Sequence, residues 1–464
     1  MMKDFHIIVA TLGFIVAVYC LVALPLSFKI VATLPFVFSI VFLFLFPTSF
    51  KKTSSLTVAI VYSLFFMRMV IIPVYGIVDG YFTGDVSSTL SENCSISVGL
   101  SLYEYVAVCF ILFIFVSNKQ SNNAVTKSLY LYGSKYFYDI VILIALVLFV
   151  IRGRSMGFFE FGFKSIGGDL ERSGDIEGGG LLRILYSLGI TFIYLLLTSY
   201  FANKYRSTAS HKYVTYSIII AMVMISIISG ERRTSQLYKG FACIWLLVGL
   251  YPLYKKQTTR SLVIVAAIII AGMTLYKQYH AFLYESYAEA LSHARGVGMS
   301  TGMLDAYFYG LNTISKNISF ADTGHLGITN LLYDLARNIF GLNYFVPRGY
   351  PLTSELYNLT LSYGESETGY LLSSVGYGYA FFGIVLAPLF TCINVLAMLL
   401  LEKAMRSTSS LEMSYIWAFI FMRFGFGFLG SYPPLINLTS RMLFVDGGLV
   451  LVASFFNKSN YKIH

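Results

Sequence analysis

Apolar runs long enough to cross a lipid bilayer recur along the whole chain. A hydrocarbon core of about 30 Å requires about 20 residues of helix. Inside lipid every backbone polar group needs a protein partner, so only helices and closed barrels can span it. The runs are continuously apolar and lack the alternation of barrel strands. The pattern therefore predicts an all-α, polytopic membrane helical bundle.

We expect about twelve transmembrane helices, because polar residues separate the apolar runs. The expected spans lie near 7–24, 30–46, 56–78, 98–116, 137–151, 181–202, 213–229, 237–253, 262–279, 373–401, 411–429 and 441–456. The first run predicts a helix rather than a cleaved signal peptide. No small-residue cleavage site follows it, and Pro25 and Lys29 lead directly into the next span.

One long polar segment interrupts this pattern. Residues 280–372 form the longest stretch that cannot lie in lipid. We therefore expect a transmembrane bundle over 1–279 (about nine spans), a large loop over 280–372 and C-terminal spans over 373–464, all within a single integrated domain. A channel does not need such a loop, whereas an enzyme that covers a polar substrate at the membrane face does.

Helical spacing recurs inside this loop. It appears at 280–294 and at 326–340, where Leu331, Leu335 and Ile339 stand at i, i+4 and i+8. These segments predict short amphipathic helices that lie over the mouth of the bundle.

Three polar stretches of the loop carry candidate chemistry. The turn GHLG contains His325, which is either solvated or catalytic. The prolines of VPRGYPL restrict the backbone around Arg348 and Tyr350. The stretch SYGESETGY places Glu365 and Glu367 just before the tenth expected span. The macrodipole of that helix would by itself favour carboxylates there.

The distribution of basic residues predicts the orientation. The 464 residues are 57% hydrophobic and 12% charged, with a formal net charge of +10. Lys and Arg collect in alternate loops, which the positive-inside rule places in the cytoplasm together with both termini. The positive charge thus indicates topology and not a nucleic-acid partner. Five cysteines form neither a disulfide framework nor a zinc spacing, and we expect no metal and no cofactor.

Arginines in the opposite, outward set of loops depart from this rule. SGERRTSQ carries Arg232 and Arg233, which form either a solvated helix cap with Glu231 or an anion site. We favour the anion site, because the guanidinium fork matches phosphate oxygens. Arg172 lies in the glycine-rich segment 152–180, which is either a solvated loop or a mobile flap over a polar substrate.

Arg68 lies near the middle of an expected span. A charge at membrane depth usually faces the bundle interior or a watery cavity. Either a structural ion pair or a substrate contact would explain it.

The chain resembles the Wzy-type O-antigen polymerases, the oligosaccharide repeat unit polymerase family. The resemblance rests on about a dozen spans with one long external loop in the C-terminal half, and on three short motifs. These are SGERRTSQLY, similar to the family's S-G-x-R segment; VPRGYPL, similar to its I-P-R stretch; and GYLLSSVGYGYAFFGIVLAP, similar to its glycine-rich approach to a helix. The family's segment has a single arginine, whereas SGERR has two, so either Arg232 or Arg233 could be the functional one.

The resemblance implies a membrane glycosyltransferase in the bacterial inner membrane. Donor and acceptor would be undecaprenyl-pyrophosphate-linked oligosaccharides, membrane lipid would flank the site, and a chain-length co-polymerase is an expected partner. The reaction would join repeat units into O-antigen or a similar surface polysaccharide at the periplasmic face.

Such a reaction assigns roles to the candidates. Arginines stabilise the diphosphate leaving group, a general base activates the attacking sugar hydroxyl, and aromatic rings contact sugar faces. The expected base is Glu367, Glu365 or His325, and the expected substrate-binding residues are Arg232, Arg233, Arg337, Arg348, Tyr350, Arg172 and Arg68.

Two other functions fit the same architecture. An O-antigen ligase would use the same donor and a different acceptor, with His325 or His293 acting beside Arg337. A flippase or transporter of the lipid-linked glycan would show internal two-fold repeats and charges along its whole depth. The sequence has no six-plus-six symmetry, and its charge is concentrated in the loops, which favours the polymerase.

Overall fold

The computed structural model describes residues 5–53, 55–83, 88–117, 129–148, 150–151, 160–161, 179–228, 233–281, 301–323, 326–347, 349–361 and 371–460. Over these residues the protein is an all-α membrane-type bundle, with one antiparallel pair of two-residue strands. The chain divides into two compact units. Unit 1 comprises 1–123, 298–402 and 424–441, and unit 2 comprises 124–297, 403–423 and 442–464.

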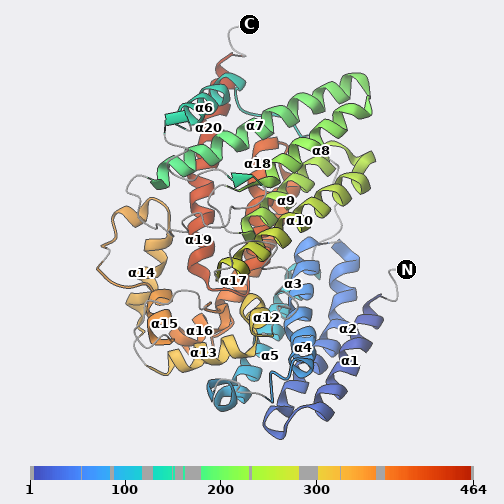
Figure 1. Cartoon of the computed structure of the whole chain (residues 1–464), viewed down its shortest axis with the longest axis vertical. Coiled ribbons are helices and arrows are strands. Elements are labelled where there is room, and N and C mark those ends of the chain that lie inside the picture. Colours follow the sequence, from blue (N-terminus) through green and yellow to red (C-terminus); the bar gives the residue numbers. More distant parts are fainter. Residues whose placement is uncertain are drawn as a thin grey trace. The chain divides into compact units, whose positions relative to one another are not determined.

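Unit 1 contains the N-terminal helices, the helices within the long polar segment and several helices that follow it (Figure 1). Its helices are α1 (Phe5–Ala23), η1 (Leu26–Ala32), α2 (Thr33–Thr53), α3 (Leu56–Phe66), η2 (Met67–Ile71), α4 (Ile72–Val78), α5 (Ser88–Ser117), α12 (Thr301–Phe308), α13 (Leu311–Ala321), α14 (Ile328–Asn338), η6 (Leu342–Tyr344), α15 (Thr353–Leu361), α16 (Ser374–Phe382), most of α17 (Leu389–Ser407) and α19 (Tyr432–Arg441).

Small residues allow close helix packing in this unit. A Cβ added at Gly13 of α1 would clash with Oγ of Ser39 of α2. Ser39 keeps its own hydroxyl bonded to the Pro35 carbonyl at 2.7 Å. Helices in lipid associate through such close contacts, because no hydrophobic driving force acts between them.

The helices α12 to α15, over residues 301–361, form a folded layer that we term the cap. In the cap, α13 packs on α5 and α16, and α14 packs on α19 (Figure 1). A shared apolar core holds the layer together; its buried members are Phe320, Leu331, Tyr357, Leu372, Tyr377 and Phe390. The predicted amphipathic helix at 326–340 is confirmed as α14, whereas most of 280–294 lies outside the described residues.

The prediction of one continuous helix over 373–401 is wrong. Helix α16 ends at Phe382, and α17 begins only at Leu389. Gly383 has φ 67° and ψ −164°, a conformation that only glycine adopts readily. The carbonyl of Val385 in the intervening turn accepts a hydrogen bond of 2.8 Å from the hydroxyl of Tyr103 in α5. The turn is therefore a fixed break, and α16 is too short to cross a bilayer.

Unit 2 is a second helical bundle. Its elements are α6 (Lys135–Leu148), β1 (Glu160–Phe161), α7 (Gly179–Thr208), α8 (His211–Ser226), β2 (Ile227–Ile228), α9 (Arg233–Leu250), η4 (Pro252–Tyr254), α10 (Lys255–Ala281), most of α18 (Leu411–Gly427), η7 (Met442–Gly447) and α20 (Gly448–Asn460). Helices α7 to α10 pack in succession, and α6 packs on α7 and α20. The carboxylate of Glu412 fastens one end of this bundle, because it accepts hydrogen bonds from the backbone of Tyr132 and Gly133 and from the Tyr138 hydroxyl.

Six segments of the described chain are long and apolar enough to cross a membrane. They are Phe5–Ala23, Leu26–Pro47, Leu56–Val78, Leu90–Val116, Ile184–Thr208 and Tyr432–Asn457. Two shorter apolar helices, His211–Ser226 and Gln236–Leu250, also coincide with expected spans. These apolar helices support the predicted membrane character, and the count of twelve spans stays a prediction.

Candidate functional site

The candidate site centres on Asp334 in the cap helix α14. This helix begins after Gly327, whose backbone N–H donates to the side chain of Asn330 at 3.1 Å. Leu331 and Asp334 are the buried residues of α14. Since they stand three residues apart, they share the face that packs into the cap core. A carboxylate thus occupies the apolar side of an amphipathic helix.

Asp334 is 2% exposed, and donors from two other helices hold its carboxylate. Oδ1 accepts the backbone N–H of Thr353, the first residue of α15, at 3.0 Å. Oδ2 accepts the hydroxyl of Tyr377, on α16, at 2.9 Å. Burial raises the pKa of Asp334; hydrogen bonds from Thr353 and Tyr377 oppose this shift, and the charge of Glu355 adds to it. The carboxyl is therefore fixed in direction and predisposed to take up a proton.

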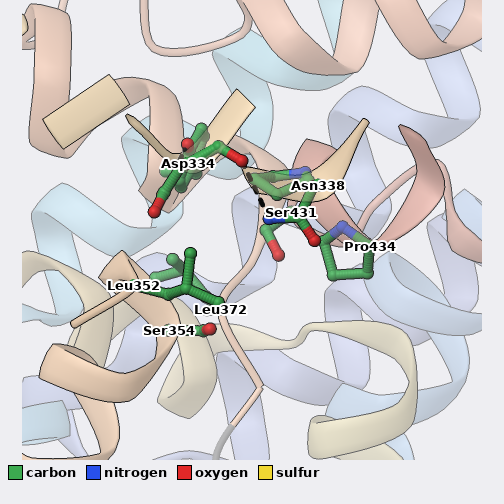
Figure 2. A pocket seen from close by; sticks show the side chains of 9 residues that line it. Asp334, Asn338, Leu352, Ser354, Leu372, Ser431 and Pro434 are labelled. Carbon is green, nitrogen blue, oxygen red and sulfur yellow. Dashed lines mark hydrogen bonds between the residues drawn. The ribbon is translucent and has the colours of Figure 1, made fainter. Parts of the chain in front are cut away.

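Asp334 lines an open pocket beside α19 (Figure 2). The pocket is small: its cavity volume is about 30 Å³, which is room for a group the size of a water molecule or a hydroxyl. Its lining comprises Asp334, Asn338, Leu352, Ser354, Leu372, Tyr377, Ser431, Pro433 and Pro434. The Asn338 amide donates to the backbone carbonyl of Asp334 at 2.8 Å, which fixes one wall. The lining combines one carboxylate with hydroxyls, an amide and apolar surface, a chemistry that suits a single hydroxyl group of a ligand.

Arg337, a predicted substrate-binding residue, lies in the last turn of α14, three positions after Asp334. Its guanidinium Nη1 donates to the Tyr333 hydroxyl at 2.6 Å and to the Tyr350 carbonyl at 3.1 Å. The macrodipole also favours a cation in the last turn of a helix. These contacts therefore fit a structural role as well as a binding role.

Tyr350, another predicted substrate-binding residue, exposes 70% of its surface. Its ring lies 6.0 Å from that of Tyr333, in an edge-on arrangement. The Tyr333 hydroxyl lies 2.8 Å from the carbonyl oxygens of both Pro347 and Tyr350. These contacts tie the segment after η6 to α14, and they leave an exposed aromatic face beside Arg337.

Arg68 forms a buried ion pair, which is the structural alternative that the sequence left open. It is 3% exposed and lies in the π-helical turn η2. Its Nη1 contacts Oε2 of Glu104 at 2.5 Å, and its Nη2 donates to Ser101 at 3.3 Å. Thr391 donates to the other Glu104 oxygen. A contact between Arg68 and substrate stays a prediction.

Basic side chains also lie along α9 and α18 of unit 2. Arg233 is the first residue of α9, and its side chain is outside the described atoms. Lys239 is 4% exposed and donates to the Ile227 carbonyl at 3.4 Å. Arg423 donates to the Tyr238 hydroxyl at 3.0 Å. Helix α9 therefore has two basic residues, Arg233 and Lys239, in its first two turns.

The remaining candidates lie outside the described residues. They are Arg172, Arg232, His293, His325, Arg348, Glu365 and Glu367. Their predicted roles are untested by the structure. Of the candidates that the structure describes, Arg337 and Tyr350 lie together in the cap. Among the described residues, no group of three His, Cys, Asp or Glu side chains is placed to hold a metal ion.

Sequence reasoning placed Asp334 in the loop but did not select it as a site residue. The signal was present, because Asp334 falls on the same helical face as Leu331 and Leu335. A carboxylate on a buried face needs partners, and burial without full pairing shifts its proton affinity. The partners Thr353 and Tyr377 are distant in sequence, so the pattern alone could not name them.

Comparisons with protein-family models, with curated proteins and with solved structures found no match to this chain.

Proposed function

We propose that this chain is a membrane glycosyltransferase that joins polyprenyl-pyrophosphate-linked oligosaccharide repeat units into a surface polysaccharide. The observation that carries the proposal is the buried Asp334 carboxylate, which lines an open pocket in a folded cap on membrane-type helices. A substrate with a lipid tail and a polar glycan requires both an apolar bundle and a polar pocket. A carboxyl with raised proton affinity suits the transfer of a hydroxyl proton.

The proposal includes the finer topology. The chain would cross the bacterial inner membrane about twelve times, with both termini in the cytoplasm and the cap at the periplasmic face. The break at Gly383 would then place α16 with the cap and α17 in the membrane. This arrangement agrees with the exposed apolar residues of the connecting turn, Ile384, Val385 and Leu386.

Arginines would stabilise the pyrophosphate as it leaves. A preorganised guanidinium stabilises developing negative charge without reorganising during the reaction. Arg337 is a described candidate, since two oxygen acceptors already fix its Nη1. Arg232, Arg233 and Arg348 are further candidates from the sequence.

The test is a gel of surface polysaccharide from a strain that lacks the gene, alone and with the gene restored. Lipid capped with a single repeat unit would support the polymerase, because export and ligation then proceed without polymerisation. Bare core lipid with accumulated lipid-linked polymer would identify a ligase. Bare core lipid with accumulated single lipid-linked units would identify a flippase, and either result would overturn the proposal.

A further inference from the structure

The Asp334 pocket has one charged group in its described lining, the carboxylate of Asp334. Among the described residues that line it, Asp334 alone has a charged side chain, and none is arginine or lysine. A pyrophosphate would meet an anion there, and like charges in a poorly solvated site repel strongly. The pocket therefore suits a neutral, hydroxyl-bearing group.

The walls suit a hydroxyl group of a sugar. Ser354, Ser431 and Asn338 bring hydroxyl and amide groups to the pocket, and Pro433 and Pro434 bring apolar surface from α19. Figure 2 shows Ser431 and Pro434 on the side of the pocket where Asn338 and Asp334 lie. The cavity of about 30 Å³ has room for one sugar hydroxyl, so the ring that carries this hydroxyl would lie at the mouth of the pocket.

The carboxylate has unused capacity to accept hydrogen bonds. An ionised carboxylate offers about four lone-pair sites. The backbone N–H of Thr353 takes one on Oδ1 and the Tyr377 hydroxyl takes one on Oδ2, and the Thr353 side chain also stabilises the ionised carboxylate. These donors come from α15 and α16, so the carboxylate cannot rotate away without breaking contacts to two helices. The remaining sites can accept a ligand hydroxyl.

We propose that this pocket admits the nucleophilic hydroxyl of the acceptor sugar, and that Asp334 accepts the proton of that hydroxyl. The proposal rests on the proposed function. As the acceptor oxygen bonds to the donor's anomeric carbon, its proton passes to Asp334. The bond from that carbon to the pyrophosphate oxygen breaks, and its electron pair leaves with the pyrophosphate. The proton then returns to solvent or to the leaving group.

The groups that act on Asp334 come from each neighbouring helix. Tyr377 lies on α16, and Thr353 and Glu355 lie on α15. Helix α19, which packs on α14, has Arg441 as its one charged residue. The Tyr377 hydroxyl donates directly to Oδ2 of Asp334. Removing this hydroxyl is therefore the simplest way to change the pKa of the Asp334 carboxyl.

The test uses the purified full chain in lipid vesicles, with a polyprenyl-pyrophosphate-linked repeat unit as donor and acceptor. Asp334→Asn keeps the size of the side chain and removes its basicity. We expect kcat to fall by about 100-fold or more, the range of general-base catalysis, with KM changed only a few-fold. Ser431→Ala should instead raise the KM for the repeat unit and leave kcat nearly unchanged.

Asp305→Asn is the matched control. Asp305 is 3% exposed, and it accepts the backbone N–H groups of Asn312 and Thr313 at the start of α13. It thus resembles Asp334 in burial and in its bonds to a helix N-terminus, but it does not line the pocket. Equal losses of kcat in both variants would assign Asp334 to structure and overturn the proposal.

Tyr377→Phe gives a second, independent readout. It keeps the carboxylate and removes one donor that stabilises its ionised form. The acidic limb of the pH–rate profile should therefore move to higher pH, and Asp334→Asn should lack this limb. An unchanged limb in Tyr377→Phe would contradict the inference. If the wild-type chain itself forms no glycosidic bond, the proposed function has failed. If the wild-type chain is active and Asp334→Asn keeps full activity, only the inference about Asp334 has failed.

Discussion

The Tyr377 hydroxyl donates a hydrogen bond of 2.9 Å to the carboxylate of Asp334, across 43 positions of sequence. The bond joins α16 to α14 and lies inside the apolar core of the cap. A polar contact in such surroundings is strong when satisfied and destabilising when broken. It therefore couples the packing of the cap to the ionisation of its buried carboxyl.

The raised pKa of Asp334 predicts a stability that depends on pH. The pKa of Asp334 in the folded protein lies above its value of about 3.9 in the unfolded chain. The protonated carboxyl therefore stabilises the fold fully below the unfolded pKa, and this stabilisation is lost as pH rises through the folded pKa. The stability of Asp334→Asn relative to wild type should thus improve as pH rises through this window. Thermal unfolding in detergent across the pH range measures it, with Asp322→Asn as a control at an exposed position. A difference in unfolding temperature between Asp334→Asn and wild type that stays constant with pH would contradict the prediction.

The Arg68–Glu104 pair predicts strong coupling between two mutations. Arg68→Met leaves a buried, unpaired carboxylate, and breaking such a pair typically destabilises by about 3–5 kcal/mol. The double variant Arg68→Met/Glu104→Gln should be destabilised by less than the sum of the single changes. Denaturation of all four proteins in a double-mutant cycle measures this coupling. A stable Arg68→Met protein without activity would favour the substrate contact instead.

Replacing Arg337 should weaken recognition of the lipid-linked donor. A hydrogen bond to a charged group contributes about 1.5–3 kcal/mol, so Arg337→Ala should lower kcat/KM for the lipid-linked donor by about tenfold or more. Arg337→Lys keeps the charge but loses the planar fork, and it should restore activity only in part. Lys316→Ala, on α13 of the same cap, controls for the general loss of positive charge. Equal effects of Lys316→Ala and Arg337→Ala would contradict a specific role.

Gly383 predicts a backbone requirement at the turn between α16 and α17. Its conformation is nearly exclusive to glycine, and forcing another residue into it typically destabilises by about 1–3 kcal/mol. Gly383→Ala should lower the unfolding temperature. Gly99→Ala in α5, where an added Cβ meets nothing within 4 Å, should be neutral or stabilising. The same loss at both positions would mean that backbone conformation is not the cause.

The sequence predicted the class of fold because lipid imposes a simple rule on it. Expected spans such as 7–24 and 56–78 agree closely with the candidate spans Phe5–Ala23 and Leu56–Val78. The expected start of the fourth span, at 98, was too late, since α5 begins at Ser88. The polar residues there indicated a loop, but Asn93 finds a partner in Ser319 of α13 at 3.0 Å. A local sequence pattern cannot predict tertiary contacts of this kind, because the two residues are far apart in the sequence.

The site was harder to predict than the fold. Tyr350 and Arg337 were selected by residue type, and the cap does bring them together. Glu104 stands in the apolar run of the fourth span, so a partner for Arg68 was present in the sequence, but the pairing needs the packing of two distant helices. The Asp334 pocket depends on α15, α16 and α19 at once, and their approach to α14 follows no periodicity in the chain.

The most direct test of the central claim is the product formed by the purified wild-type chain from a polyprenyl-pyrophosphate-linked repeat unit. The account predicts lipid-linked products of two or more units, with one polyprenyl pyrophosphate released for each new glycosidic bond. Mass spectrometry of the extracted lipids measures both quantities. Recovery of only single-unit lipid, with no polyprenyl pyrophosphate released, would contradict the account.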